Sequence, residues 1–379
     1  MSDRDPAELD SALTRSALAG LVPYEPGKPI EEVQRELGLD RVVKLASNEG
    51  SFGPFPKALE ALARSAPELN RYPDGGAYML RSVLAERHRV PFEEVAIGAG
   101  ADGLIDCISQ ATLDPGDEIV CGWPSFPSYV IYALKLGATV RRIPLVEDCY
   151  DLEAMVEAIG PRTKLVYVCH PNNPTGTMNT RSELDSYFRG VPEHVVTVLD
   201  QAYFEYVEHP EYPDGIEEYF KAGQRVVVLR TFSKIYGLAG LRVGYALVPA
   251  SLGTAIGKVR RAFDVSSQAQ AAALASLDGG GELELARRRS VNAEGRAALE
   301  AILGDHGLQP AGPAVANFVY TEVGPEAETL FESLLREGVI VRPLQAFGAP
   351  EAIRVTVGAP EEQRLLRSAL DGVLARVPS

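Results

Sequence analysis

The sequence predicts an α/β fold with two domains: a large domain with a mostly parallel central sheet sandwiched by helices, and a smaller α+β domain. Near-continuous Val/Leu runs separated by helical segments indicate parallel strands that are covered on both faces. Toward the C-terminus the pattern changes to long helices followed by shorter alternating elements. At 379 residues, the chain is also longer than one ordinary core accommodates.

The N-terminal segment predicts an extended arm that leads into a short helix. Three prolines fall within "LVPYEPGKP", and a proline disfavours helix at the residue before it. From Ile30 onward the sequence "IEEVQRELGLD" becomes helix-like. We expect residues 1–40 to form this arm and helix, and to pack with the small domain or a partner subunit.

The large domain is expected over residues 41–255. Its predicted strands are "EEVAIGAG", "GDEIVCGWPSF", "TKLVYVCH", "HVVTVLDQAY" and "QRVVVLRTFSK". Between them, "ADGLIDCISQATL" and "SELDSYFRGV" are predicted to be helical. Because such strands alternate with helices along the chain, a parallel arrangement is favoured.

The small domain is expected over residues 256–379. Helices are predicted at its start in "GTAIGKVRRAF" and "QAQAAALASL", and "GGGE" then breaks the chain. A long charged helix follows through Arg296. The strand-like runs "ANFVYTEV", "VIVRPL" and "AIRVTVG" then alternate with helices, which is typical of an α+β unit.

Composition excludes several classes of function. A net charge of -15 argues against nucleic acid or an anionic membrane as the main partner. No stretch approaches the roughly 20 apolar residues of a membrane helix, and the N-terminus has no apolar signal core. Neither the scattered cysteines nor the histidines have metal-ligand spacing, so no metal is expected. These observations predict a cytoplasmic protein with reduced thiols at Cys107, Cys121, Cys149 and Cys169.

Polar residues follow three of the predicted strands at their carboxyl ends. Asn173 comes after "KLVYVCHPN", Asp200 after "VVTVL", and Lys234 after "VVVLRTFS". Ligands of open α/β sheets bind in the crevice outside the carboxyl ends of the strands. A lone lysine there is more often a solvated surface residue, but three such residues in successive strands favour one shared ligand.

These residue types match the needs of pyridoxal 5'-phosphate. Its aldehyde requires a lysine amine for a Schiff base, which Lys234 supplies. Its ring nitrogen requires a carboxylate partner, and Asp200 fits this role. Its phenolic oxygen requires hydrogen-bond donors, for which Asn173 and Tyr203 are candidates. The sequence therefore predicts a cofactor site at this edge of the sheet.

The cofactor's phosphate and ring need further contacts. The turn "GAGADGL" lies between a strand and a helix, so the backbone N–H groups of Ala101 and Asp102 are expected to face the phosphate. Alone, such a glycine-rich turn is a weak signal and is more often explained by packing. Phe126 is a candidate to stack on the ring, although an aromatic residue in such a loop often belongs to the core. The loop that carries Lys234, called the lysine loop below, offers three further candidate contacts for the phosphate: Thr231, Ser233 and Arg242.

The motifs "NNPTG", "LDQAYFEY" and "RTFSKIYGLAGLRVGY" occur in this order, and with them the chain resembles the fold-type-I, pyridoxal-phosphate-dependent aminotransferases. The closer resemblance is to the histidinol-phosphate aminotransferase family. It extends from "LVPYEPGKPIEEV" through "VVKLASNEG" and "RYPDGG" to "ANFV", "VIVRPL" and "IRVTVG". The resemblance thus covers nearly the whole chain, and it implies the fold-type-I architecture.

The resemblance also implies roles for residues outside the strand ends. Tyr72, in "RYPD", would reach the phosphate of a partner subunit, so the active unit would be a homodimer. Arg354 would bind the substrate carboxylate, for which a guanidinium fork is suited. Arg342 and Tyr24 match positions near the substrate phosphate, and Asn48 is a further substrate-side candidate. Each also has a structural interpretation, such as tyrosine packing, a solvated strand-end arginine or an asparagine turn.

Two positions depart from the family pattern. Gln201 stands where the family usually has an acidic residue beside the aspartate, and Gly50 stands in "NEGSFGP" where the family usually reads Asn-Glu-Asn-Pro. Both are expected near the pocket, so they bear on the identity of the substrate.

The implied activity is a two-step transamination of histidine biosynthesis. Histidinol phosphate and 2-oxoglutarate would be converted to imidazole-acetol phosphate and glutamate in a ping-pong cycle through the Lys234 Schiff base. The main alternative is an aromatic amino-acid aminotransferase acting on phenylalanine or tyrosine. A phosphothreonine decarboxylase and a non-catalytic sensor are further alternatives, although an acidic chain suits a DNA-binding regulator poorly.

Overall fold

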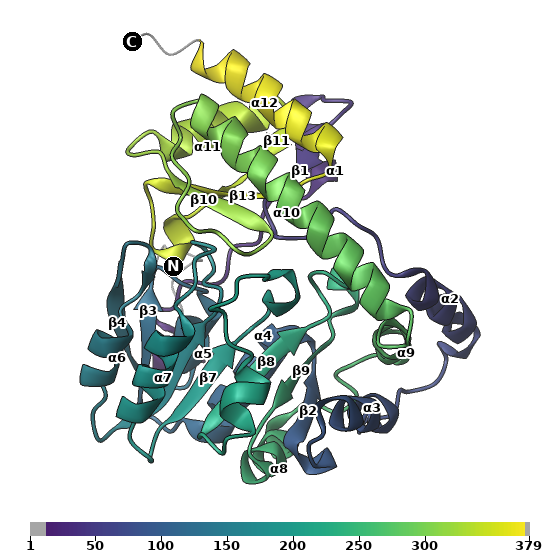
Figure 1. Ribbon diagram of the computed structural model, residues 1–379, viewed down its shortest axis with the longest axis vertical. Helices are drawn as coiled ribbons and strands as arrows, with labels where there is room; N and C mark the ends of the chain where they lie inside the picture. The colour runs from purple at the N-terminus through teal and green to yellow at the C-terminus, as the bar shows by residue number, and fades with distance from the viewer. Residues whose placement is uncertain (1–12, 376–379) are drawn as a thin grey trace, which may run out of the picture.

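A computed structural model of the chain describes residues 13–375 and contains a larger α/β body and a smaller α+β body (Figure 1). The helices are α1 (Ile30–Leu37), α2 (Pro56–Ser65), α3 (Tyr78–His88), α4 (Gly100–Thr112), α5 (Ser128–Lys135), α6 (Leu152–Glu157), α7 (Arg181–Gly190), α8 (Ala250–Val259), α9 (Ser267–Ser276), α10 (Gly281–Asp305), α11 (Ala327–Arg336) and α12 (Pro360–Leu374). The strands are β1 (Val43–Lys44), β2 (Val95–Gly98), β3 (Glu118–Trp123), β4 (Thr139–Val146), β5 (Cys149–Tyr150), β6 (Thr163–Cys169), β7 (Val196–Asp200), β8 (Val226–Thr231), β9 (Gly244–Leu247), β10 (Phe318–Glu322), β11 (Val339–Ile340), β12 (Arg342–Pro343) and β13 (Ala352–Thr356).

The larger body is built on an eight-stranded sheet in the order β2-β9-β8-β7-β6-β3-β4-β5. The central strands β8, β7, β6, β3 and β4 are mutually parallel, whereas β9 and β5 run antiparallel to their neighbours. In β7 and β8 nearly every residue is buried, because helices cover both faces of the sheet. This confirms the predicted mostly parallel α/β architecture.

The register of the central strands aligns the predicted site. Cys169 at the end of β6 pairs with Asp200 at the end of β7, and Asp200 pairs with Leu229 of β8. The carboxyl ends of the three strands therefore lie side by side. The segments that follow these three strands lie at the carboxyl-terminal end of the sheet, below the smaller body in Figure 1.

The smaller body contains the antiparallel sheet β10-β13-β12 and the parallel pair β1-β11. A second hydrophobic core fills it, and this core is separate from the one around the large sheet. Strand β1 lies near the start of the chain, so the smaller body combines residues from both ends of the sequence.

Helix α10 links the two bodies, running from one to the other in Figure 1. Leu285 near its start packs in the large core, whereas Leu299, Ile302 and Leu303 near its end pack in the small core. The sequence predicted that this helix extends through Arg296, but it ends at Asp305, because these apolar residues continue its buried face. Core packing on the large sheet thus continues past residue 256, and the division at that point stays a prediction.

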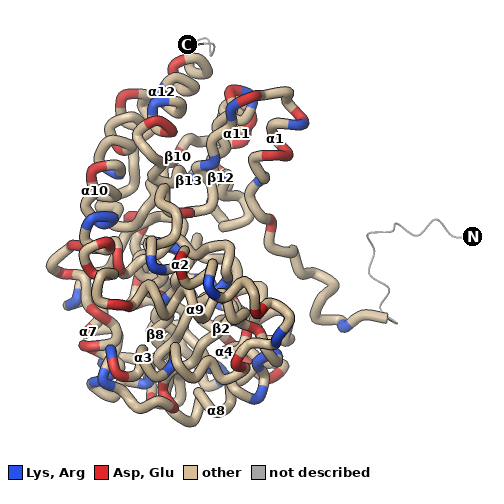
Figure 2. The backbone as a smooth tube through the Cα atoms, turned by 90° about the vertical axis from the view of Figure 1, so that its right-hand side faces the viewer, with Lys and Arg blue, Asp and Glu red and all other residues tan. Residues whose placement is uncertain are grey.

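The segment before α1 is mostly extended and runs along the side of the molecule in Figure 2. It contacts both bodies, because Tyr24 packs against Phe126 and the Glu25 carbonyl accepts a hydrogen bond from Arg342. Helix α1 begins after Pro29, has Glu31 and Glu32 in its first turn, and ends at Gly38 in the left-handed conformation. The predicted start at Ile30 is therefore confirmed. In the described residues 13–375, no helix is long and apolar enough to cross a membrane.

Candidate active site

The predicted carboxylate, Asp200, is buried at the end of β7. Its two oxygens accept hydrogen bonds from the Tyr129 hydroxyl at 2.8 Å and from the Ala202 backbone N–H at 3.0 Å. Burial raises the pKa of Asp200 to about 6, against the lowering effect of these two donors. A cationic group bound next to Asp200 would therefore stabilise the ionised form of this buried carboxylate.

The predicted lysine, Lys234, lies three residues after β8 and is half-buried beside the carboxyl ends of β6, β7 and β8, a region called the crevice below. Its Nζ donates to the Ser47 carbonyl at 3.4 Å and lies 5.4 Å from the centroid of the Tyr203 ring. Burial lowers its pKa to about 7, and the nearby guanidinium of Arg354 contributes to this lowering. A substantial fraction of the amine is therefore neutral, and nucleophilic, near neutral pH.

Tyr203 lies just after β7 and its hydroxyl oxygen accepts a hydrogen bond from Asn48 Nδ2 at 2.9 Å. Asn48 is itself buried, and its predicted place on the substrate side stays a prediction. Burial raises the pKa of Tyr203 well above its usual value, so the phenol keeps its proton.

Asn173 and Arg354 form one unit across the two bodies. The Arg354 guanidinium, on β13, donates to Asn173 Oδ1 and, at 2.7 Å, to the Ala46 carbonyl. Burial lowers the pKa of Arg354 to about 10, so it stays charged at neutral pH. Since Oδ1 is occupied, the amide N–H₂ group of Asn173 remains to donate into the crevice.

The turn before α4 provides a backbone cradle. Gly100 has a φ of 75°, and an added Cβ there would lie 2.8 Å from the Arg242 guanidinium. A Cβ on Gly244 would likewise lie 2.8 Å from the Ala101 nitrogen. Both glycines therefore allow a close approach of backbone N–H groups and the arginine at the start of a helix, an arrangement that binds anions.

Side chains fix the two loops that border this cradle. The Asp102 carboxylate accepts hydrogen bonds from Ser128 at 2.6 Å and Tyr132 at 2.7 Å, so its backbone N–H group, and not its side chain, is the anion-facing candidate. In the lysine loop, Arg242 donates to Ser233 Oγ at 3.4 Å. Thr231 Oγ1 accepts from the Ser233 N–H at 3.1 Å.

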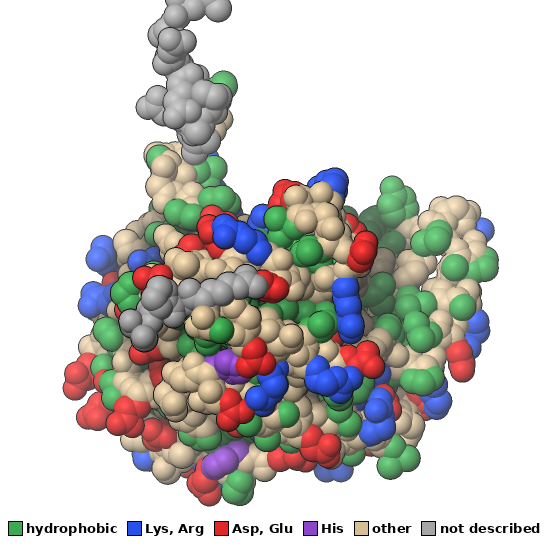
Figure 3. All heavy atoms as spheres, turned by 90° about the horizontal axis from the view of Figure 1, so that it is seen from above, with side chains coloured by type: hydrophobic (Ala, Val, Ile, Leu, Met, Phe, Trp, Pro, Cys, Tyr) green, Lys and Arg blue, Asp and Glu red, His purple; other side chains and the backbone are tan. Residues whose placement is uncertain are grey.

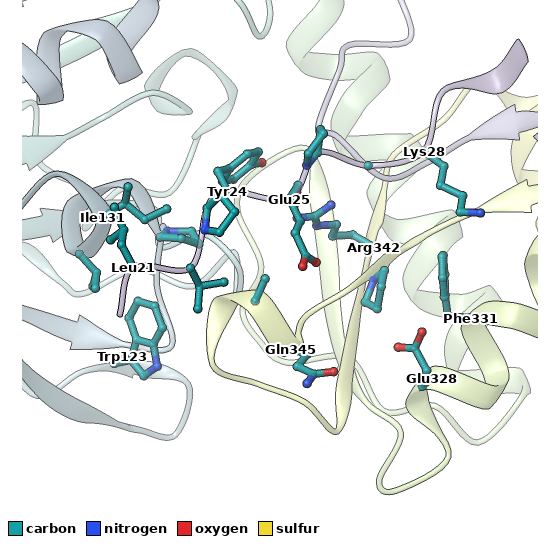
Figure 4. A pocket seen from close by; sticks show the side chains of 18 of the residues that line it. Leu21, Tyr24, Glu25, Lys28, Trp123, Ile131, Glu328, Phe331, Arg342 and Gln345 are labelled. Carbon is teal, nitrogen blue, oxygen red and sulfur yellow. Dashed lines mark hydrogen bonds between the residues drawn. The ribbon is translucent and has the colours of Figure 1, made fainter. Parts of the chain in front are cut away.

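Tyr24, Phe126 and Arg342 lie together beside the arm. The rings of Tyr24 and Phe126 meet edge to face with centroids 6.4 Å apart, and the Arg342 guanidinium lies 5.8 Å from the Tyr24 ring. Arg342 also donates to the Glu25 carbonyl at 2.6 Å. Figure 4 shows Tyr24 and Arg342 bordering a pocket of about 670 Å³, which Leu21, Trp123 and Ile131 also line.

Tyr72 is the one predicted site residue in residues 13–375 that the structure places apart from the others. Its side chain is 81% exposed and stacks on Phe263, with the ring centroids 4.7 Å apart. Within a single chain it contacts none of the crevice residues named above. Its predicted role in a partner's site remains a prediction.

The two departures from the family pattern have different surroundings. Gln201 points away from the crevice: it accepts from Arg230 and the Gly215 N–H, and donates to Tyr212. Its influence on the substrate would thus be indirect. Gly50 does border the lysine loop, because an added Cβ would lie 3.2 Å from the Lys234 carbonyl.

Sequence patterns missed three residues that support the site. Tyr129 holds Asp200, and Thr356 and Asn317 hold Asn48 through hydrogen bonds at 3.0 and 3.1 Å. The only available signal was weak: Thr356 stands two residues after Arg354, so the two side chains share one face of β13.

The arrangement combines a neutralisable amine, a buried carboxylate, an anion cradle and a buried guanidinium around one crevice. The family model described as "Aminotransferase class I and II" matches residues 40–372. The chain therefore belongs to the class I and II aminotransferases.

Within that family, the chain is similar to proteins named histidinol-phosphate aminotransferase. The one named "Histidinol-phosphate aminotransferase 2" from Carboxydothermus hydrogenoformans is 44% identical over 364 residues, which cover 96% of this chain and 99% of that protein. A solved relative, the histidinol-phosphate aminotransferase from Sinorhizobium meliloti in complex with pyridoxal-5'-phosphate, has a TM-score of 0.85 at 28% identity and covers 96% of this chain and 98% of its own. Thermus thermophilus aspartate aminotransferase with maleate has a TM-score of 0.83 at 25% identity and covers 96% and 99%.

Proposed function

We propose that this chain is a pyridoxal-phosphate-dependent aminotransferase that exchanges the amino group between histidinol phosphate and 2-oxoglutarate. The observation that carries the substrate assignment is a pair of buried arginines. Arg342 of β12 and Arg354 of β13 are directly opposite in register, and each has a buried Nε without a hydrogen-bond partner. In the described residues, Arg342 donates to the Glu25 carbonyl, and Arg354 donates to the Asn173 amide oxygen and the Ala46 carbonyl, so both buried cations remain for anionic ligands.

The residues of the crevice fit pyridoxal phosphate. Lys234 supplies the amine for its aldehyde, and Asp200, whose pKa burial raises to about 6, gains a cationic partner in the protonated ring nitrogen. The cradle formed by Gly100, Ala101 and Arg242 suits the phosphate. The remaining contacts would come from Asp102, Phe126, Asn173, Tyr203, Thr231 and Ser233.

When bound, the cofactor supplies an electron sink for the charge that develops at the substrate α-carbon. The chain's own residues supply the rest. Lys234 Nζ would take the proton from the substrate α-carbon as a base and deliver it as an acid to the carbon that was the cofactor's aldehyde, with the reverse transfer in the second half-reaction. The pKa of Lys234, which burial lowers to about 7, suits both roles. Asn173 and Tyr203 would donate hydrogen bonds to the phenolic oxygen, and Arg354 would orient glutamate through its carboxylate.

Glutamate has two carboxylates, whereas histidinol phosphate has one phosphate dianion and no carboxylate, so the pocket must accept both kinds of anion. Arg354 lies against Asn173, close to the reacting centre, whereas Arg342 lies farther out beside Tyr24 and the arm. The two arginines would bind the two carboxylates of glutamate one each, and would bind the phosphate of histidinol phosphate together, because each anion suits a guanidinium fork. Phenylalanine has one singly charged carboxylate, so a second buried guanidinium at Arg342 favours the phosphate dianion of histidinol phosphate over phenylalanine.

Arg354→Lys is expected to lower kcat/KM for glutamate by roughly 100-fold. The lysine keeps a positive charge but loses the guanidinium fork, and hydrogen bonds to charged groups are each worth about 1.5–3 kcal/mol. Steady-state kinetics with glutamate measure this effect. Arg364→Lys, an exposed arginine on α12, is the matched control and is expected to retain wild-type kinetics. Wild-type kcat/KM in an Arg354→Ala enzyme would exclude the assignment.

A homodimer completes the proposal. Tyr72 stacks on Phe263, and both side chains are exposed. Further exposed hydrophobic residues are Leu59 on α2, Leu69 after it, Tyr78 and Met79 on α3, and Leu283 on α10. Figure 3 shows hydrophobic side chains gathered on the side of the molecule where α2 lies. Such a surface suits a second copy of the chain, and Tyr72 would then extend toward the partner's phosphate cradle.

Mixing two inactive variants tests the dimer and the role of Tyr72 together. In a heterodimer of Tyr72→Ala and Lys234→Ala chains, one site would combine an intact lysine with the partner's intact tyrosine. Refolding an equal mixture is expected to restore about a quarter of wild-type sites, as random pairing predicts. No restoration, or a fully active monomer in sedimentation at assay concentration, would contradict the proposal.

Substrate comparison tests the activity itself. The proposal predicts turnover of histidinol phosphate with 2-oxoglutarate at a kcat/KM well above that for phenylalanine. Higher kcat/KM with phenylalanine would assign the chain to the aromatic aminotransferases, and release of carbon dioxide from substrate would indicate a decarboxylase.

A further inference from the structure

Asn48 occupies a strained position between the two bodies. It lies between β1 and α2, is 1% exposed, and has a φ of 53°, a left-handed conformation that asparagine and aspartate tolerate better than most residues. Holding it there costs free energy, so its neighbours must fix it. They do so from far along the sequence: Tyr203 from the larger body, and Asn317 and Thr356 from the smaller body.

The hydrogen bonds around Asn48 determine which way its amide points. Thr356 Oγ1 accepts the Asn48 backbone N–H at 3.0 Å and donates its own hydrogen to Asn48 Oδ1 at 3.2 Å. With Oδ1 occupied by this donor, the Nδ2 group faces Tyr203, to whose oxygen it donates at 2.9 Å. The reversed amide would leave the Thr356 hydrogen facing an N–H₂ group.

The direction of the Asn48–Tyr203 hydrogen bond matters for the site. A phenol has one hydrogen to donate, and its oxygen is an acceptor for others. Because Asn48 donates to this oxygen, the Tyr203 hydrogen stays available for another acceptor. If the amide were reversed, Tyr203 would donate to Asn48 Oδ1, and its hydrogen would be lost to the crevice.

We propose that Asn48 is a positioning residue that keeps the Tyr203 hydroxyl pointed at the cofactor's phenolic oxygen. Thr356 fixes the direction of the hydrogen bonds from Thr356 through Asn48 to Tyr203, a chain called the relay below. This inference rests on the proposed function, because it requires a cofactor to receive the hydrogen bond. It reassigns Asn48 from substrate contact to control of Tyr203. It also couples strand β13 to the cofactor site, since Thr356 lies on the same strand as Arg354.

The test is the pH midpoint of the visible absorbance band of the cofactor-loaded enzyme, which reports the proton affinity at the lysine–cofactor linkage. Loss of a donor to the phenolic oxygen raises this midpoint. Asn48→Asp turns the donor into an acceptor and is expected to raise the midpoint by about one pH unit, which corresponds to one hydrogen bond. Asn48→Gly removes the donor without adding charge, and about half of that shift is expected. Aspartate and glycine both tolerate the left-handed backbone at this position.

Combining each change with Tyr203→Phe separates the relay from a simple charge effect. If Asn48 acts through Tyr203, both shifts fall to less than half in the Tyr203→Phe background, because no hydroxyl remains to be oriented. Equal shifts in both backgrounds, or no shift in either, would overturn the inference.

Thr356 provides a second test, because its substitutions change no charge and it reaches the Tyr203 hydroxyl only through Asn48. Thr356→Val is expected to raise the midpoint and weaken cofactor binding several-fold, whereas Thr356→Ser, which keeps the hydroxyl, restores both. Equal values for valine and serine would contradict the relay. A wild-type protein that shows no visible band with added cofactor would overturn the proposed function as well, whereas a normal wild-type band with unresponsive variants overturns the relay alone.

Discussion

Lys234→Ala is expected to lower transamination by at least ~10³-fold and to abolish the absorbance band of the lysine–cofactor imine. The variant lacks both the amine that joins the aldehyde and the base that moves the α-proton, and general acid–base catalysis alone contributes roughly 10²–10⁴-fold. Steady-state turnover and the absorbance spectrum measure the two losses separately.

Lys234→Arg is the matched control for charge, because it keeps a cation but provides no nucleophilic amine. It is expected to be as inactive as Lys234→Ala. Near-wild-type turnover in either variant would remove Lys234 from the mechanism.

The lowered pKa of Lys234 adds a pH dependence. Only the neutral amine attacks the aldehyde, and the neutral fraction rises as pH increases through about 7. Cofactor capture by the cofactor-free protein is therefore expected to accelerate between pH 6 and 8. An ordinary lysine would show this rise near pH 10 instead.

Asp200→Asn is expected to lower kcat by roughly 10²–10³-fold, the range for removal of one preorganised electrostatic contact. The amide is similar in size and can keep the hydrogen bond from Tyr129, but it cannot neutralise a protonated ring nitrogen. Single-turnover kinetics with a saturating amino acid measure the chemical step directly.

Asp185→Asn on α7 is a suitable control for Asp200→Asn, because it also neutralises a carboxylate that accepts from a tyrosine, Tyr219. It lies outside the crevice and is expected to retain wild-type kcat. An Asp200→Asn enzyme with unchanged kcat would show that the buried carboxylate does not act on the cofactor.

The central sheet was predictable because its signal is local. The strands that end near Asn173 and Asp200 are buried on both faces, so unbroken apolar runs mark them in the sequence. Strand β4 gave no such signal, because its exposed and half-buried residues alternate at the side of the sheet. Strand β9 was hidden within the lysine loop motif and runs antiparallel between β2 and β8.

The residue types of the site could be predicted from the sequence, but the contacts between their side chains could not. Strand ends placed Asp200 and Lys234 in one crevice, since parallel strands share an edge. The Asn48–Tyr203 bond joins residues 155 positions apart, and the facing of Arg342 and Arg354 depends on an antiparallel register. Such contacts are set by how the two bodies pack, and no local pattern encodes that packing.

The central claim is that this crevice transfers an amino group from histidinol phosphate. The most direct test mixes cofactor-loaded protein with histidinol phosphate, and separately with phenylalanine, and follows loss of the visible band in a single turnover. Rapid conversion with histidinol phosphate and much slower conversion with phenylalanine is the predicted result. Comparable or faster conversion with phenylalanine would contradict the substrate assignment, and the absence of any band in the loaded protein would contradict the cofactor site beginning with Lys234.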